Sequence, residues 1–323
     1  MAIKYYLGIE GIVVKVKGIF FTVVSAVLFG LTPVLARLVQ EMGGNALTLT
    51  FYRNFIAIPI LGLILFCKKV GFRLPVSSLK SIMLVGIAGV GLTTLLLYSS
   101  YDYIGISTAT TLHFLYPVFV AILCRIFYKE KLSRIKVVTL VVATLGIGLF
   151  LERSQAGTDT APGTILAVVS GLTYGYYMMD MEKKGLSKLH PILVSFYMAS
   201  FISGALLVYN IAVRQIVFLL PPKAYLYIFI MAVCTSFLAV ALLQVGIQYL
   251  SATTAAIFCL FEPVTSNIAG VLFLNETLSV AKVIGSIIIL GAAAALAILD
   301  QEPQKLELAE QEAQQEVHLT EEG

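Results

Sequence analysis

An internal repeat is the feature that most constrains what this chain can fold into. Residues 107–136 recur at residues 253–282 in one ungapped register, 146 positions further along the chain. The pairs that match in that register include Thr108 with Thr254, Ala109 with Ala255, Pro117 with Pro263, Val118 with Val264, Glu130 with Glu276, Leu132 with Leu278 and Lys136 with Lys282. Apolar matches arise easily by chance, but shared Pro, Glu and Lys in one register indicate an internal duplication. The fold must therefore contain two related units.

Composition places both units in a membrane. Hydrophobic residues make up 59% of the 323 residues and charged residues only 12%, whereas a soluble domain carries roughly a quarter charged residues. Such a chain cannot cover a water-facing surface, and about 20 apolar residues span the hydrocarbon core of a bilayer. Ten apolar runs near this length are present, at residues 18–40, 46–67, 81–101, 105–128, 135–151, 163–181, 191–213, 224–248, 253–274 and 280–299.

The repeat extends over the whole apolar part of the chain and predicts its topology. With a shift of 145 positions, the first run matches the sixth at Gly18 with Gly163, Val23 with Val168, Val24 with Val169, Ser25 with Ser170 and Gly30 with Gly175. Each half then holds five helices, and because five is odd, the second half must insert upside down. Inverted repeats of this kind are typical of secondary transporters, whose substrate sites lie near the bilayer midplane. The prediction is an all-α polytopic membrane protein of ten transmembrane helices in two inverted five-helix repeats, residues 1–151 and 152–299.

The charge of the loops predicts the orientation. If the N-terminus is cytoplasmic, 16 of the 22 Lys and Arg residues fall on the cytoplasmic side, so the positive-inside rule places both termini in the cytoplasm. The expected location is the plasma membrane. The first run is longer than the apolar region of a signal peptide and lacks a clear cleavage site, so we expect a retained helix. Residues 300–323 are polar and acidic, which predicts a disordered or loosely helical cytoplasmic tail.

Two stretches carry a family resemblance, TLHFLYPVFVAIL…FYKEKLSRIK and IFCLFEPVTSNIAGVLFLNETLS…GSIIILGA. They resemble the EamA-type branch of the drug/metabolite transporter superfamily, in which the fourth helix of each repeat carries Pro-Val and an acid followed by Leu-Ser opens the fifth. Arg53, in FYRNF, also matches, and the resemblance covers residues 18–299. The chain departs from the pattern where Tyr-Lys-Glu and Asn-Glu replace the glycine that often precedes the acid. The resemblance implies export or exchange of small metabolites, often amino acids or cationic drugs.

Glu262 is the sharpest candidate for a functional residue. A carboxylate deep in an apolar run is expensive in lipid, so it should face a cavity or a partner. Pro263 beside it removes a backbone donor and is expected to leave a carbonyl one turn earlier free for a ligand or ion. Glu262 is therefore predicted to bind substrate or a proton, and the alternative is a structural carboxylate that holds neighbouring polar groups together.

Two further charged or titratable residues lie in apolar runs. Arg53 could bind a carboxylate or phosphate through its guanidinium, or it could extend to the outer interface or bridge to an acid. His113 lies one turn before Pro117 on the same helix face and could take part in proton coupling. The competing interpretation of His113 is a hydrogen-bonded core residue, which is the more common role of a lone histidine among apolar neighbours.

The remaining candidates are polar residues near the two prolines and in the other runs. We place Tyr116, Tyr98, Tyr174, Tyr177 and Asn267 on the substrate or proton path, although tyrosines in such positions are often interface anchors. Glu130 and Glu276 are predicted to cap the fifth helix of their repeat, because acids are favoured near helix N-termini. The four cysteines lie in apolar runs without paired spacing, which favours buried thiols over disulfide or metal ligation.

These observations predict a secondary transporter that exports or exchanges an amino acid or related metabolite by alternating access. Protons are a candidate coupling partner, a homodimer is left open, and no nucleic-acid partner, cofactor or metal is expected. The absence of a Walker loop argues against an ATP-driven pump. The alternatives are an uncoupled facilitator of the same fold, an intramembrane enzyme acting on lipid, and a structural or signalling membrane protein. An enzyme would need a compact His, Asp or Glu cluster, so we predict that the chain is not one.

Overall fold

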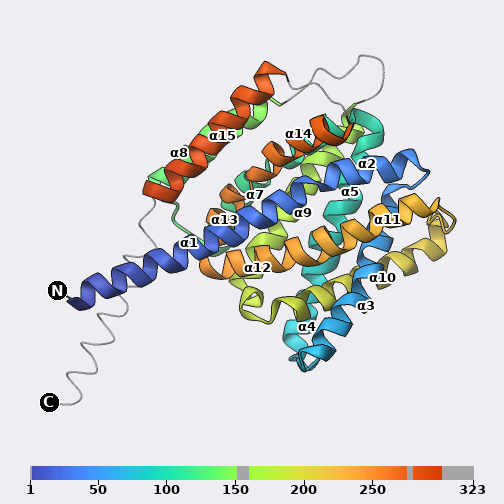
Figure 1. Cartoon of the computed structure of the whole chain (residues 1–323), viewed down its shortest axis with the longest axis horizontal. Coiled ribbons are helices and arrows are strands. Elements are labelled where there is room, and N and C mark those ends of the chain that lie inside the picture. Colours follow the sequence, from blue (N-terminus) through green and yellow to red (C-terminus); the bar gives the residue numbers. More distant parts are fainter. Residues whose placement is uncertain (1, 151–159, 275–278, 300–323) are drawn as a thin grey trace.

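The computed structural model describes residues 2–150, 160–274 and 279–299, and every regular element in these ranges is a helix. The elements join into ten helical rods, five from each repeat (Figure 1). The rods of the first repeat are α1 (Ala2–Gly30) with α2 (Thr32–Glu41), α3 (Ala46–Cys67), α4 (Val76–Leu84) with the π-helix η1 (Val85–Gly91) and α5 (Leu92–Ile104), α6 (Ile106–His113) with α7 (Tyr116–Tyr128), and α8 (Arg134–Gly148). The second repeat holds α9 (Ala161–Lys183), α10 (Pro191–Val213), α11 (Pro222–Met231) with the π-helix η3 (Ala232–Ala239) and α12 (Val240–Tyr249), α13 (Ala252–Phe258) with α14 (Phe261–Leu274), and α15 (Val280–Leu299). A short 3-10 turn, η2 (Leu186–Lys188), precedes α10.

Eight of these rods are long and apolar enough to cross a membrane. The other two are α8 and α9, and α8 has 15 residues, a length of about 22 Å at the rise of an α-helix. Large apolar side chains are exposed on the outside of the bundle, including Phe66 at 77% and Leu272 at 69%. Such faces need lipid rather than water around them. The predicted all-α multi-pass membrane fold is confirmed, and ten crossings stay a prediction.

The second helices of the two repeats pack against each other in opposite directions. Near one end of the pair, Gly62 of α3 lies against the ring of Phe196 in α10. At the other end, Asn45 Nδ2, just before α3, donates a hydrogen bond to Gln215 O, just after α10, at 2.7 Å. Equivalent helices of the two repeats are therefore antiparallel, as inverted repeats require.

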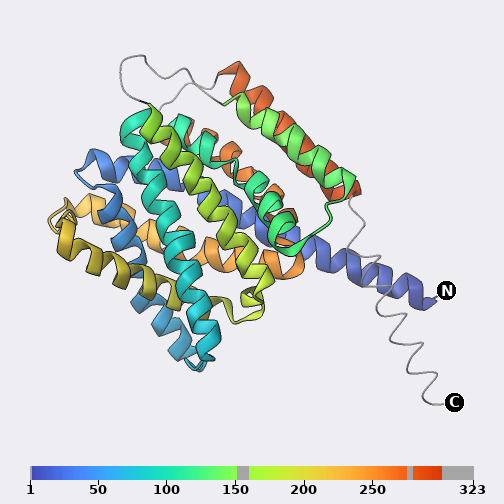
Figure 2. The same ribbon diagram turned by 180° about the vertical axis from the view of Figure 1, so that it is seen from behind.

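The fifth helices form a second antiparallel pair at the edge of the molecule. Gly146, near the end of α8, packs on Gly285, near the start of α15, whereas Leu140 clusters with Leu296 near the other ends. Figure 1 shows this pair standing along one side of the bundle, and Figure 2 shows the same arrangement from behind. The fifth and tenth rods are thus peripheral, and the other eight surround the centre.

The first helix of each repeat packs across the molecule onto the other repeat. A Cβ on Gly18 of α1 would lie 2.8 Å from the side chain of Tyr249, and one on Gly163 of α9 would lie 2.5 Å from that of Tyr103. Tyr249 and Tyr103 are equivalent positions of the repeat, so the same close helix contact is made twice. A second equivalent pair of contacts joins Gly30 to Thr265 and Gly175 to Phe119.

The third and fourth rods are irregular at equivalent places. Each third rod contains a π-helical segment, η1 or η3, and such segments are frequent at functional sites. Each fourth rod is interrupted by a two-residue turn, between α6 and α7 and between α13 and α14, just before Pro117 and Pro263. Proline cannot donate to the previous turn, which explains the interruption. The expected free carbonyl is absent at Pro263, because Cys259 O accepts from Glu262 N at 2.8 Å.

The predicted caps of the fifth helices need a correction. The N-cap of α8 is Ser133, whose hydroxyl accepts from Lys136 N at 3.3 Å, and Ser279 accepts from Lys282 N at 3.3 Å before α15. Glu130 therefore does not cap α8, because it lies three residues before the cap and instead pairs with Lys183 Nζ at 2.6 Å. Glu276 and the acidic tail, residues 300–323, lie outside the described residues.

Candidate functional site

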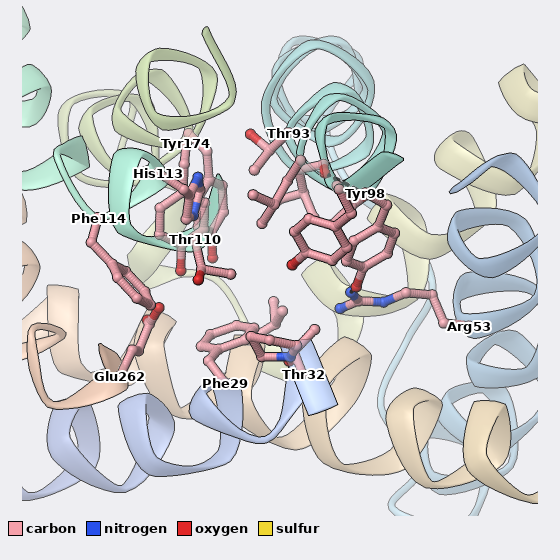
Figure 3. Close-up of a pocket in the computed structure, with 17 residues that line it drawn as sticks. Phe29, Thr32, Arg53, Thr93, Tyr98, Thr110, His113, Phe114, Tyr174 and Glu262 are labelled. Atoms are coloured by element: carbon pink, nitrogen blue, oxygen red, sulfur yellow. Dashed lines mark hydrogen bonds between the residues drawn. The ribbon is translucent and has the colours of Figure 1, made fainter. Parts of the chain in front are cut away.

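A cavity of about 60 Å³ lies between the two repeats. Its walls come from the first four rods and from α9, α12 and α14 (Figure 3), so both halves of the duplication build it. Seven of the predicted site residues lie at the cavity or directly behind its wall: six of them line it, namely Glu262, Arg53, His113, Tyr98, Tyr174 and Tyr177, and Tyr116 lies behind Glu262. The cavity therefore lies between the two halves, and the role of its lining residues on a substrate or proton path stays a prediction.

Glu262 lies in the first turn of α14 and is only 5% exposed. Its carboxylate accepts a hydrogen bond from the hydroxyl of Tyr116 at 3.3 Å. Tyr116 and Glu262 occupy the same position of the two repeats, immediately before Pro117 and Pro263. This contact joins equivalent residues of the two repeats and therefore marks the pseudo-symmetry axis of the molecule.

An aromatic cluster surrounds this contact. The rings of Tyr116 and Tyr174 meet edge to face with centroids 4.7 Å apart, and His113 lies 5.5 Å from each of them. His113 Nδ1 and the hydroxyl of Ser170 are hydrogen-bonded at 2.9 Å. Since Ser170 belongs to α9, this bond ties the fourth rod of the first repeat to the first rod of the second. His113 is thus a hydrogen-bonded core residue that also faces the cavity, and its part in proton coupling stays a prediction.

Arg53 lies on the opposite side of the cavity from Glu262 (Figure 3). Its side chain is 3% exposed, with Nε donating to the Ser236 hydroxyl at 2.8 Å and Nη1 donating to the Tyr98 hydroxyl at 2.6 Å. The alternative that Arg53 extends to the outer interface is therefore wrong. Arg53 points inward and links α3 to α5 and to the π-helical segment η3.

Glu262 and Arg53 give the two sides of the cavity different chemical character. A carboxylate stands on one wall and a guanidinium on the other, with aromatic rings and hydroxyls of threonines between them. A carboxylate attracts ammonium groups and a guanidinium pairs with carboxylates. The arrangement suits a small solute that carries both charges, or one charge and an apolar body.

Asn267 and Pro263 line a separate pocket of about 30 Å³, which is bordered mainly by α6 and α14. Asn267 Nδ2 is buried without a hydrogen-bond partner among the described residues. Pro117 is buried in the first turn of α7. Asn267 is thus not a residue of the central cavity, although it was predicted on the same path.

Several residues of the cavity escaped prediction, notably Phe29, Thr93, Thr94, Thr110 and Phe114. Threonine and phenylalanine are ordinary in transmembrane helices, and these rods are apolar on every face, so no periodic signal separates the inner face from the lipid face. The one available signal was the nearness of Thr110 and Phe114 to Pro117 in sequence.

Comparison with known proteins agrees with this architecture. The model of the EamA-like transporter family matches the chain twice, at residues 16–151 and 161–298. An uncharacterized transporter of Archaeoglobus fulgidus is 28% identical over 270 residues, which cover 83% of this chain and 92% of that protein. Solute carrier family 35 member G1 of Mus musculus is 25% identical over 202 residues, 59% of this chain and 54% of that protein.

A crystal structure with 17% sequence identity shares the fold, with a TM-score of 0.72 over 87% of this chain and 96% of that chain. The family match falls on both halves of the duplication, which confirms the resemblance drawn from the repeated proline motifs. This chain is a multi-pass membrane protein that belongs to the EamA-like transporter family.

Proposed function

We propose that this transporter exports or exchanges a small amino-acid-like metabolite across the cytoplasmic membrane by alternating access. The observation that carries the proposal is the cavity between inverted repeats with Glu262 and Arg53 on opposite walls. An α-amino acid presents an ammonium and a carboxylate, the two groups that these side chains bind best. The aromatic wall between them suits an apolar side chain.

The size of the cavity supports movement during transport. A volume of about 60 Å³ accommodates water-sized occupants rather than an amino acid. The rods around it must therefore separate for substrate to enter. Inverted repeats provide such a movement, because one half can rock against the other around a fixed midplane site.

Glu262 is proposed to couple transport to protons. The hydrogen bond described for its side chain comes from Tyr116, a neutral phenol, so the carboxylate is buried without a described ion-pair partner. A buried carboxyl in this setting can carry a proton in one conformation and a substrate ammonium in another. We place both termini in the cytoplasm, and we propose that the chain acts as a carrier and not as an enzyme.

Counterflow in reconstituted vesicles tests the proposal. Purified protein is placed in liposomes loaded with one unlabelled amino acid at a time, and uptake of the same labelled amino acid is followed. Accumulation for at least one member, absent in protein-free liposomes, is the expected result. Failure of every member of an amino-acid panel would contradict this substrate class, and accumulation without any dependence on a pH gradient would favour the uncoupled facilitator.

A further inference from the structure

The pocket that contains Asn267 shares a wall with the central cavity. Pro33, Thr110 and Phe114 border both spaces. Phe114 is 5% exposed and lies in the turn that interrupts the fourth rod between α6 and α7. We infer that this second pocket is the outer exit of the transport path and that Phe114 is the gate between it and the substrate cavity. The inference rests on the transport function proposed above.

The lining of the second pocket is chemically suited to a polar solute. Ser107, Thr111, Ser266 and Asn267 contribute hydroxyl and amide groups to its wall. The Asn267 amide nitrogen is buried without a partner among the described residues. A buried N–H group normally has an acceptor, so a water molecule or a carboxylate oxygen of a passing solute would satisfy it. The central cavity, in contrast, is bordered mostly by aromatic and apolar groups.

The duplication shows what occupies the equivalent place at the other end of the molecule. The repeat register relates Ser107 to Thr253, Thr111 to Ile257, Phe114 to Leu260, Ser266 to Val120 and Asn267 to Ala121. Each of these five counterparts is at most 5% exposed, whereas Ser107, Ser266 and Asn267 are partly exposed. The same five positions thus form a polar pocket at one end of the molecule and a buried, mostly apolar seal at the other. Inverted-repeat carriers are expected to be open on one side and closed on the other.

Hydrogen bonds reinforce the sealed end. Gln244 Nε2 donates to the backbone carbonyls of Leu186 and Leu189 at 3.0 and 2.8 Å, which ties α12 to the turn between α9 and α10. Lys183 Nζ joins Glu130 and Glu182 at 2.6 and 2.8 Å, and the other oxygen of Glu182 accepts from Ala252 N. These residues lie at the end predicted to face the cytoplasm, where the basic loops gather. The polar pocket therefore lies toward the outside.

Cysteine labelling from either side of the membrane tests the inference without a known substrate. In a background with all four native cysteines replaced by alanine, Asn267→Cys is compared with its counterpart Ala121→Cys. A membrane-impermeant maleimide added to intact cells should label Asn267→Cys about tenfold faster, because thiol reactivity follows exposure. Glu41→Cys, on an exposed helix end, verifies that the reagent reaches the outer face. Equal rates for the two variants, or labelling of Asn267→Cys only in inverted vesicles, would overturn the outward exit.

The gate is tested by asking whether Phe114 limits access to the central cavity. Thr94→Cys reports on that cavity, since Thr94 lines it and hydrogen-bonds only within its own helix, to Val90 O and Gly91 O at 3.1 Å each. Adding Phe114→Ala should speed its labelling from outside about tenfold, since the side chain between the two spaces is removed. The counterpart Leu260→Ala should leave the rate unchanged. An unchanged rate with Phe114→Ala, or an equal gain with Leu260→Ala, would disprove the gate.

The two proposals fail in different ways. Loss of counterflow with every amino acid would leave these labelling rates intact, and would contradict only the substrate class. Normal counterflow together with equal labelling of the paired variants would contradict only the exit path. Each variant is also labelled after denaturation in detergent and analysed by size exclusion, so that a misfolded variant is recognised. If Asn267→Cys or Ala121→Cys misfolds, the pair Ser266→Cys and Val120→Cys takes its place.

Discussion

Arg53 and Glu262 are the charged side chains that line the central cavity. They are 3% and 5% exposed, respectively, and side chains of this kind are almost never so buried unless they have partners. Arg53 is bonded to two hydroxyl groups from other rods, whereas the bond described for Glu262 comes from Tyr116. Arg53 is thus held in place, whereas Glu262 is the group that we propose exchanges partners during transport.

Replacing Glu262 with glutamine should remove substrate affinity while preserving shape. Glu262→Gln keeps an oxygen that can accept from Tyr116 but loses the negative charge. A hydrogen bond to a charged group is worth about 1.5–3 kcal/mol, so KM for a cationic or zwitterionic substrate should rise about 10- to 100-fold, and any dependence of counterflow on pH should flatten. Glu41→Gln, at an exposed site, is the control. A KM and pH profile equal to those of the unmodified protein would show that Glu262 is structural.

Removing the Tyr98 hydroxyl should destabilise the protein by leaving part of Arg53 unpaired. Tyr98→Phe takes away the acceptor that lies 2.6 Å from Nη1 in a fully buried setting. Leaving a buried donor without an acceptor costs about 1–3 kcal/mol, which should appear as a lower Tm in detergent. Tyr103→Phe is the matched control on the same helix, because Tyr103 is 46% exposed. Equal Tm values for the two variants would contradict this role.

The tyrosines also show where prediction from sequence reached its limit. Tyr98 and Tyr101 line the cavity, whereas Tyr103, on the same helix, is exposed. Residues three apart share a helix face, so Tyr98 and Tyr101 could be grouped from sequence. Which face points inward could not be deduced, because the rods are apolar all round and only packing against the second repeat decides it.

At the scale of helices, glycines allow two helices to pack closely where they cross. Gly30 of α1 lies where the first rod crosses α14, and a Cβ there would stand 2.6 Å from Thr265 and 2.9 Å from the carbonyl of Glu262. The backbone that positions the candidate site is therefore held directly by this crossing. The repeat aligned Gly30 with Gly175 in sequence, but it could not say that each glycine faces the opposite half.

Adding one methyl group at Gly30 should be destabilising, although alanine is the better helix former. Overpacking a close contact costs about 1–3 kcal/mol, so Gly30→Ala should lower Tm and slow transport by displacing α14. The matched control is Gly204→Ala in α10, where a Cβ would meet nothing within 4 Å, and where alanine should be neutral or stabilising by up to about 1 kcal/mol. Thermal unfolding of both variants measures the difference, and a Gly30→Ala protein as stable as Gly204→Ala would refute the close contact.

The fifth helices illustrate a wrong choice between neighbouring polar residues. The motif offered both an acid and a serine before each helix, and the acid was chosen as the cap. Ser133 and Ser279 occupy the cap positions, because a short hydroxyl side chain can reach the backbone N–H three residues on. Glu130 lies too far before the helix and is drawn to Lys183 of the second repeat instead.

At the scale of the whole molecule, duplication predicted more than any single motif. The repeat register, the inverted arrangement and the expectation of a site between the two halves followed from counting and aligning apolar runs. The difference between the two ends did not follow, because the polar outer pocket and the apolar seal around Leu260 occupy equivalent positions of the repeat. Only the packed structure shows which end holds the polar pocket.

The sealed end should loosen when its ion pairs are removed. Lys183→Met breaks the contacts to Glu130 and Glu182, which connect α9 to the end of α7 and, through Ala252, to α13. Labelling of Ala121→Cys in inverted vesicles should then rise severalfold, because the open-inward population grows. Lys184→Met is the control, since Lys184 pairs with Asp180 inside α9 alone. No difference between the two variants would mean that the ion pairs do not contribute to closure.

The contact between Tyr116 and Glu262 has a consequence for how such a molecule can arise. Two identical five-helix chains related by a two-fold axis would bring the same residue to that axis twice. Two carboxylates would then face each other and repel, and two phenols would leave the centre uncharged. A fused chain can place an acid in one copy and its hydrogen-bond donor in the other, at 3.3 Å. A single chain that contains both repeats can therefore pair two different groups at the axis, whereas a dimer of two identical halves cannot.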